Sequence, residues 1–174
     1  MNSKLKTQNS KLAFISLGSN LGNSHEIILQ AMVRLQNFSS EPSWKSSLWQ
    51  TTPVDCPPGS PLFVNAAVGF IPLQNETPES LLEKLQHLEK EFGRQQKKIL
   101  NEARPLDLDL IAFGNEVRST ENLVLPHPRA HERKFVLQPL AEIAPDLILP
   151  GQQKSVKELL DSLEATEVLI RLQD

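Results

Sequence analysis

Two aspartates separated by a single leucine, Asp107 and Asp109, are the residues whose spacing points most directly to chemistry. They lie in the segment 103–113, where apolar and polar side chains alternate as they do along a β-strand. One face of this strand would carry Leu106, Leu108, Leu110 and Ala112. Both carboxylates would share the other face about 6.5 Å apart, close enough to hold one or two divalent cations. Mg²⁺ is commonly held by one or two carboxylates and substrate phosphates, so the pair predicts a magnesium-nucleotide site, with solvated surface aspartates as the alternative.

Basic residues flank the acidic strand on both sides. Arg94, Lys97, Lys98 and Arg104 precede it, and His127, Arg129 and Arg133 follow it. Arginine binds phosphate oxygens through a planar fork of donors and stays charged. These residues are therefore predicted to bind the phosphates of a nucleotide beside the metal, although a cluster of charge can also be an ordinary solvated surface.

Two other candidate sites are disfavoured by their own sequence. The turn 18–23 is glycine-rich, but it lacks the lysine of a G-x-x-x-x-G-K-[ST] loop and the spacing of G-x-G-x-x-G. His127 and His131 are four residues apart, as zinc ligands on a helix can be, but Pro128 opposes a helix through His127. A turn that lines a pocket and a histidine that contacts phosphate are the preferred interpretations.

An aromatic and an amide side chain follow a proline-rich loop. Residues 52–61 contain four prolines and one glycine, which excludes regular structure. A loop of this length is either disordered or a functional lid. Phe63 and Asn65 come directly after it and would share one face of a strand, where they can stack on and hydrogen-bond to a planar heterocycle. A core phenylalanine beside a turn-capping asparagine is an equally open alternative.

Strands and helices alternate around these residues. Strands are predicted at 12–17, 43–52, 63–70 and 103–113, helices at about 27–35, 77–92 and 155–163, and a hairpin tip at 115–117 that returns through 123–125. Residues 135–147 return the chain to the core. This order favours an α+β, ferredoxin-like (split βαβ) fold over a doubly wound parallel sheet. The sheet would be largely antiparallel, with helices over one face.

Composition limits the classes of protein that the chain can be. Its 174 residues, 39% hydrophobic and 22% charged, are typical of one globular domain, expected at 12–174 after a flexible extension at 1–11. A net charge of −3 provides no field for nucleic acid, and no segment approaches the ~18 apolar residues of a membrane span. The single cysteine, Cys56, favours a reducing, cytoplasmic setting. We expect a monomer with no nucleic-acid or membrane partner.

Taken together, these motifs resemble the 6-hydroxymethyl-7,8-dihydropterin pyrophosphokinases of folate biosynthesis. The matching stretches are 15–22, Thr52-Pro53, 63–67, Gly93-Arg94, 104–109 and Pro126-His127-Pro128-Arg129, with Arg133 and Phe135. They extend over most of residues 12–150. The run 104–109 together with Pro126-His127 is the specific part of the resemblance, whereas the Gly-Ser-Asn turn alone is not.

The resemblance implies a ferredoxin-like, ATP-dependent diphosphokinase that transfers the β,γ-pyrophosphoryl group of ATP to the hydroxymethyl group of a dihydropterin and releases AMP. Asp107 and Asp109 would bind two Mg²⁺ ions, and Arg94 and Arg104 would be the catalytic arginines. The ATP contacts would be Glu89, Leu110, His127 and Arg133. The pterin pocket would consist of Thr52, Pro53, Asp55, Phe63, Asn65 and Phe135, with the ring held between the two phenylalanines.

One departure from the family pattern lies just before Arg104. Many members carry Trp-Gly-Pro there, whereas this chain has Asn101-Glu102-Ala103. We therefore expect the loop 94–104 to close differently over the nucleotide. Two other classes share part of the pattern: a nucleotide-sugar transferase with an Asp-x-Asp metal site, which normally needs a longer chain, and a nucleotide sensor without catalysis.

Overall fold

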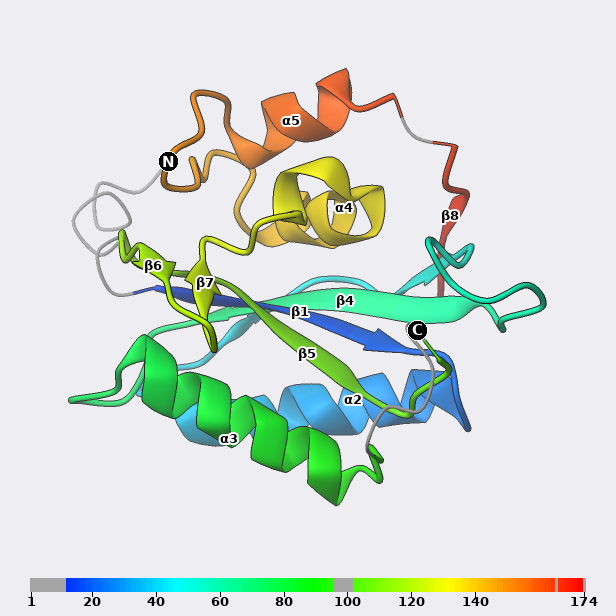
Figure 1. Ribbon diagram of the computed structural model, residues 1–174, viewed down its shortest axis with the longest axis horizontal. Coiled ribbons are helices and arrows are strands. Elements are labelled where there is room, and N and C mark those ends of the chain that lie inside the picture. The colour runs from blue at the N-terminus through cyan, green and yellow to red at the C-terminus, as the bar shows by residue number, and fades with distance from the viewer. Residues whose placement is uncertain (1–11, 96–101, 165, 174) are drawn as a thin grey trace.

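The computed structural model describes residues 12–95, 102–164 and 166–173 (Figure 1). Its main sheet follows the path β5-β1-β4-β3-β8. These strands are β5 (Asp107–Phe113), β1 (Ala13–Ser19), β4 (Phe63–Phe70), β3 (Trp49–Thr51) and β8 (Leu169–Arg171). The short strand β2 (Trp44–Lys45) also pairs with β4, and every pairing in the sheet is antiparallel.

Helices cover both faces of this sheet (Figure 1). α2 (Ser24–Leu35) and α3 (Pro78–Glu91) lie on one face, and α4 (Lys134–Ile143) packs on the other, with α5 (Val156–Ser162) against α4. The expectation of helices on one face was wrong, because α4 buries Val136, Leu137 and Leu140 in a second core. All residues of β1 and β4 are consequently buried.

The connectivity is ferredoxin-like, as predicted. The elements β1-α2-β3-β4-α3-β5 form two βαβ halves, and their strands lie in the spatial order β5-β1-β4-β3. Several elements extend this unit, among them α4, α5 and the C-terminal strand β8. The sequence did not predict β8, since three residues carry too little periodicity to identify a strand.

A bulge in β5 changes which of its side chains lie on each face of the sheet, compared with the prediction. Phe14 pairs with Ala112 and Ile15 pairs with Leu110, which leaves Ile111 as the extra residue. Leu108 and Leu110 lie in the core with α2 and α3, whereas Ile111 and Ala112 both lie in the core with α4. The prediction that Ala112 shares the face of the leucines was therefore wrong. The pattern that places Asp107 and Asp109 on one face lies before the bulge and is unaffected.

Three strand boundaries also differ from the prediction. β5 begins at Asp107, after Pro105, which has no backbone N–H for a strand ladder. The segment 43–52 forms the two short strands β2 and β3 in place of one. The returning segment forms β7 (Val124–Leu125), and it pairs with β6 (Arg118–Ser119) in a separate two-stranded sheet.

Helix ends follow the local signals in the sequence. α3 begins after Thr77, whose side chain accepts a hydrogen bond from the Ser80 N–H at 3.1 Å in a capping box. It ends just before Gly93, which has a φ of +90° that favours glycine. This turn delivers Arg94 to the start of β5. No helix in the described part of the chain is long and apolar enough to cross a bilayer.

Candidate active site

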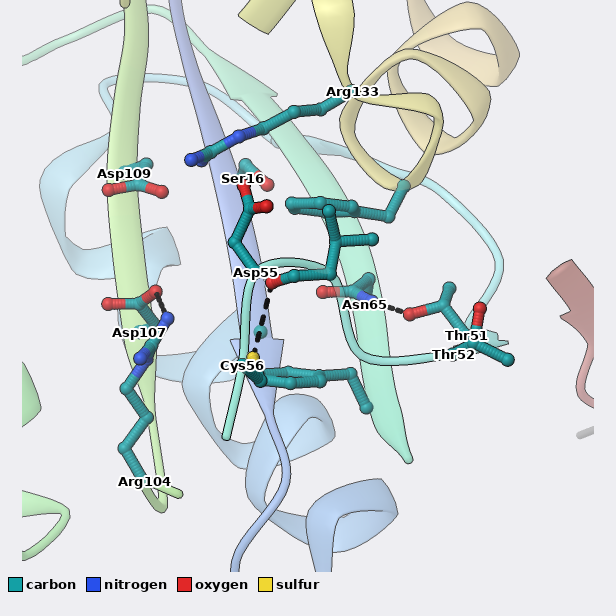
Figure 2. Close-up of a pocket in the computed structure, with 14 residues that line it drawn as sticks. Ser16, Thr51, Thr52, Asp55, Cys56, Asn65, Arg104, Asp107, Asp109 and Arg133 are labelled. Atoms are coloured by element: carbon teal, nitrogen blue, oxygen red, sulfur yellow. Dashed lines mark hydrogen bonds and ion pairs between the residues drawn. The ribbon is translucent and has the colours of Figure 1, made fainter. Parts of the chain in front are cut away.

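A cavity that opens toward solvent lies on the α4 face of the sheet (Figure 2). Its floor is formed by Ser16 and Gly18 of β1, Asp107 and Asp109 of β5, and Phe63 and Asn65 of β4. The end of β3, Thr51, and the loop after it close one side with Thr52, Val54, Asp55 and Cys56. Arg104, Arg133 and Phe135 complete the wall. One end of the cavity is therefore strongly charged, and the other is aromatic and polar.

The two aspartates project from β5 into the charged end, as predicted (Figure 2). The register with β1 places Asp109 opposite Ser16 and Asp107 opposite Gly18. Burial raises the pKa of Asp109, and the neighbouring charge of Asp107 raises it further. No hydrogen bond or ion pair from the described residues reaches the Asp109 carboxylate, so its oxygens are available for a ligand.

Two arginines bind Asp107, one at each carboxylate oxygen. Nη1 of Arg94 lies 2.7 Å from Oδ1, and Nη2 of Arg104 lies 2.7 Å from Oδ2. The Arg104 guanidinium also lies 5.8 Å from the centre of the Phe63 ring, and its Nε is buried without a hydrogen-bond partner. Both predicted catalytic arginines thus converge on the acidic pair, with Arg104 between the charged and aromatic ends.

Glu89 of α3 contacts both Arg94 and the start of β5 from outside the cavity. Its Oε1 accepts a hydrogen bond from the backbone N–H of Leu108 at 2.7 Å and also pairs with Arg94. Burial raises the pKa of Glu89 to about 7, although the Leu108 N–H and the Arg94 charge oppose this shift. Glu89 does not line the cavity. It anchors both Arg94 and the first residues of β5.

The opposite end of the cavity offers a slot for a flat, polar ring. Asn65 is 3% exposed, and its Nδ2 donates a hydrogen bond to Oγ1 of Thr51 at 2.7 Å (Figure 2). Phe63 and Phe135 line the same cavity. An aromatic ring offers stacking surface, and a fixed amide offers directional hydrogen bonding, which together suit a planar heterocycle.

Most of the predicted heterocycle-binding residues meet in this cavity. Thr52, Asp55, Phe63, Asn65 and Phe135 all line it, whereas Pro53 is not among the lining residues. Asp55 also pairs with Arg129 across 2.9 Å, which connects the proline-rich loop to the segment after β7. Arg129, expected to contact phosphate, instead has Asp55 and Glu132 as carboxylate partners.

The predicted nucleotide-binding residues are divided between the cavity and its surroundings. Arg133 lines the cavity, and its guanidinium lies 5.5 Å from the centre of the Phe135 ring. His127 lies just outside, where burial lowers its pKa while the Asp109 charge opposes that shift. The Leu110 side chain does not reach the cavity, because it lies in the core on the α2–α3 face.

The structure does not support the alternative zinc site, and it does not describe two of the predicted phosphate contacts. Within the described residues, no group of three or more His, Cys, Asp or Glu side chains could hold a metal ion, so the alternative zinc site at His127 and His131 gains no support. The predicted phosphate contacts Lys97 and Lys98 lie outside the described residues.

Sequence reasoning did not single out four lining residues, Ser16, Thr51, Val54 and Cys56, whereas Gly18 belongs to the turn 18–23 that was predicted to line a pocket. Ser16 carried a signal, since it is a polar residue inside an otherwise apolar strand. Gly18 carried another, as the glycine that ends the apolar run 12–17, and the structure shows that a Cβ there would lie only 3.0 Å from Oδ1 of Asn65. Neither signal could be placed opposite Asp107 and Asp109 without the β1–β5 register.

Comparison with known proteins identifies the family of this chain. A model of the 7,8-dihydro-6-hydroxymethylpterin-pyrophosphokinase (HPPK) family matches residues 14–145, more than half of the chain. The chain belongs to this family. The resemblance identified from the sequence motifs is therefore confirmed.

Two bacterial relatives of similar length are named as pteridine pyrophosphokinases. A 2-amino-4-hydroxy-6-hydroxymethyldihydropteridine pyrophosphokinase of Haemophilus influenzae is 38% identical over 154 residues, covering 86% of this chain and 93% of that protein. The enzyme of the same name from Bacillus subtilis is 40% identical over 133 residues, covering 76% and 77%. The match with these HPPK proteins thus extends over most of both chains.

Longer proteins match this chain over only part of their length. Folic acid synthesis protein fol1 of Pneumocystis carinii is 36% identical over 166 residues, which cover 93% of this chain but 22% of that protein. Among solved structures, wild-type HPPK-DHPS of Plasmodium falciparum with pteroate has a TM-score of 0.67 at 14% identity, covering 87% of this chain and 42% of that one. The chain spans less than half the length of these proteins, and the structural likeness at this identity supports the fold.

Proposed function

We propose that this HPPK-family chain transfers the pyrophosphoryl group of ATP to the hydroxymethyl group of 6-hydroxymethyl-7,8-dihydropterin, which gives AMP and the pterin diphosphate used in folate biosynthesis. The observation that carries the proposal is one cavity with two different ends. A carboxylate pair and two arginines gather at one end, and Phe63, Asn65 and Phe135 line the other. A triphosphate and a flat heterocycle would therefore meet between them.

The acidic pair fits Mg²⁺ by its donor set. Asp107 and Asp109 project side by side into the cavity, and both are half-buried. Mg²⁺ is usually held by one or two carboxylates while substrate phosphates and water fill its other positions, so a third protein ligand is not needed. Two ions, bound with ATP, are our proposal. When bound, Mg²⁺ would neutralise charge on the phosphate oxygens and favour ionisation of the substrate hydroxyl.

Positively charged side chains of the protein would then surround the phosphates of ATP during the transfer. The hydroxymethyl oxygen forms a bond to the β-phosphorus, the bond between that phosphorus and the α,β-bridging oxygen breaks, and AMP leaves with the bonding electrons while the hydroxyl proton passes to solvent. Arg94 and Arg104 would move from Asp107 to phosphate oxygens, where their planar donors bind the transferring group. Arg133 and His127 would bind the remaining phosphates.

The pterin would be oriented by the aromatic and polar end. Phe63 and Phe135 would hold the ring between them, and Asn65, fixed by Thr51, would recognise its edge. Thr52, Pro53 and Asp55 would complete this pocket, and closure of the proline-rich loop would exclude water that competes for ATP. Glu89 would act through Arg94. A direct nucleotide contact by Leu110 would have to use its backbone, since its side chain is in the core.

The decisive experiment is AMP release from ATP and Mg²⁺ in the presence of 6-hydroxymethyl-7,8-dihydropterin. We expect AMP only when the pterin is present. A sugar transferase would yield a nucleoside diphosphate instead, and a nucleotide sensor would yield no product. Asp107→Asn and Asp109→Asn should abolish AMP release while the fold survives, and a folded, active variant would overturn the metal assignment. The cytoplasmic location, the monomeric state and the single domain at 12–174 stay predictions.

A further inference from the structure

The C-terminal strand lies against one wall of the cavity. β8 pairs with β3 in the register Thr51 opposite Leu169, directly beside the Thr51–Asn65 hydrogen bond. The pairing continues into the proline-rich loop, where Thr52 N–H donates to the Val168 carbonyl at 3.2 Å. The Val168 N–H donates in return to Oγ1 of Thr52 at 3.3 Å. The segment 167–172 thus fixes the start of the loop that closes the cavity.

The same segment also contacts the opposite wall, through Glu167. Its Oε2 accepts a hydrogen bond from the backbone N–H of Phe135 at 3.0 Å. Phe135 is in the first turn of α4, and the residue at the helix start, Arg133, provides no side-chain cap. First-turn N–H groups have no partner inside a helix, and a carboxylate there is favoured by the helix dipole. Glu167 therefore supplies the cap that the helix sequence lacks.

This cap lies where the two ends of the cavity meet. Arg133 and Phe135 both line the cavity, and the Arg133 guanidinium lies over the Phe135 ring. Holding the first turn of α4 therefore fixes one proposed phosphate-binding side chain and one proposed pterin-binding ring together. Glu167 and Val168, the two residues just before β8, contact α4 and the loop after β3 respectively. The segment 167–168 is therefore bonded to both walls of the slot.

We propose that Glu167 is a positioning residue for the pterin pocket, acting through the Phe135 backbone to set the α4 wall against the β3 wall. The inference rests on the proposed function, because it assigns the dihydropterin to the slot that these walls enclose. Glu167 would not touch the substrate. Its effect should therefore appear in affinity for the dihydropterin, with little effect on the nucleotide.

The chain provides two matched controls. Glu164 is an exposed glutamate three positions before Glu167 in the sequence. Glu142 lies at the other end of α4, where its carboxylate accepts hydrogen bonds from Ser47 N at 2.7 Å and Trp49 Nε1 at 2.8 Å. Glu142→Ala removes a connection between α4 and the β2–β3 segment without touching the first turn of the helix. It separates a general loss of stability from a loss of positioning.

The test measures the dissociation constant of 6-hydroxymethyl-7,8-dihydropterin with Mg²⁺ and a non-hydrolysable ATP analogue, together with the thermal midpoint of each variant. Glu167→Ala should weaken pterin binding about fivefold, as expected for one lost hydrogen bond, and leave analogue binding unchanged. Glu167→Gln keeps an acceptor oxygen and should restore most of the affinity. Glu164→Ala and Glu142→Ala should bind the pterin like the wild type, the latter with a lower thermal midpoint.

Each result has a distinct meaning. Pterin affinity in Glu167→Ala equal to that in Glu142→Ala would overturn the positioning role, even if both variants were less stable. If the alanine variant does not fold, Glu167→Asp carries the same test, because its carboxylate is one methylene shorter and should weaken pterin binding in the same direction. Wild-type protein that binds no dihydropterin would overturn the proposed function and this inference with it.

Discussion

Asn20 binds both backbone polar groups of Arg104. The Arg104 N–H donates to Oδ1 of Asn20 at 2.9 Å, and the Asn20 N–H donates to the Arg104 carbonyl at 3.1 Å. Asn20 is 3% exposed and directly follows β1, which lies beside β5. The backbone of Arg104 is thus attached to the rigid sheet, while its side chain can leave Asp107 for a phosphate. The Gly-Ser-Asn turn acquires a role here that its sequence alone did not indicate.

Asn20→Ala should therefore slow the reaction more than it weakens binding. Loss of the Oδ1 acceptor frees the Arg104 backbone, and misplacement of a charge-stabilising group should reduce kcat about tenfold with little change in the KM for the pterin. Steady-state AMP release measures both parameters. Asn23→Ala is the control, since Asn23 belongs to the same turn but caps Glu26 N–H. Equal kcat values for the two variants would contradict the role of Asn20.

Arg104→Ala should separate catalysis from nucleotide affinity. A contact that strengthens as charge develops on the transferring group raises kcat more than ground-state binding, so kcat should fall on the order of a hundredfold or more. The dissociation constant of ATP, measured by calorimetry, should change far less. If the affinity fell as much as kcat, Arg104 would be a ground-state anchor.

The same variant should also bind metal more tightly before nucleotide arrives. In the structure the Arg104 guanidinium occupies Oδ2 of Asp107, a proposed metal ligand. Removing that competing cation should lower the dissociation constant for Mn²⁺, measured by electron paramagnetic resonance without nucleotide. Arg129→Ala is the control, because Arg129 pairs with Asp55 on the proline-rich loop. Unchanged Mn²⁺ affinity in Arg104→Ala would show that the two cations do not compete at Asp107.

Gly18→Ala should disturb the pterin slot from the floor of the cavity. A Cβ at this position would lie 3.0 Å from Oδ1 of Asn65 and 3.8 Å from the Phe63 ring, so the amide must shift. We expect the KM for the pterin to rise about tenfold while the KM for ATP stays near its wild-type value. Gly69→Ala is the control, since its Cβ would press on Phe14 in the core and lower stability. Similar pterin KM values in both variants would contradict a specific effect.

Local sequence patterns were sufficient for the features that depend on neighbours along the chain. Alternation placed Asp107 and Asp109 on one face, and the Thr77 cap and Gly93 bounded α3. The bulge in β5 could not be predicted, because residues 110–112 are all apolar and give no sign of the extra residue at Ile111. The ferredoxin-like order followed from the succession of elements, whereas the second helical layer depended on where α4 folds back.

Contacts between distant segments could not be predicted. Asn20 reaches Arg104, and Glu167 reaches Phe135, only after the sheet and α4 have formed. Residue type gives no warning, since a glutamate in a C-terminal segment is usually a solvated surface residue. The family resemblance supplied the identities of Glu89 and His127, but not the fact that Glu89 bonds to the backbone of β5.

Glu89 should make stability depend on pH. Its pKa is raised to about 7 by burial, above an ordinary value of about 4.5, so the folded chain keeps a proton that the unfolded chain releases. This contribution is fully present below about pH 4.5 and is lost as the pH rises through 7. Between pH 5 and pH 8 the free energy of unfolding should fall on the order of 2 kcal/mol more in wild type than in Glu89→Gln.

Urea denaturation in EDTA measures this free energy at each pH. Glu83 is exposed on the same helix, so Glu83→Gln should retain the wild-type slope of unfolding free energy against pH. Equal slopes in wild type and Glu89→Gln would mean that the Leu108 N–H and Arg94 together hold the carboxylate ionised.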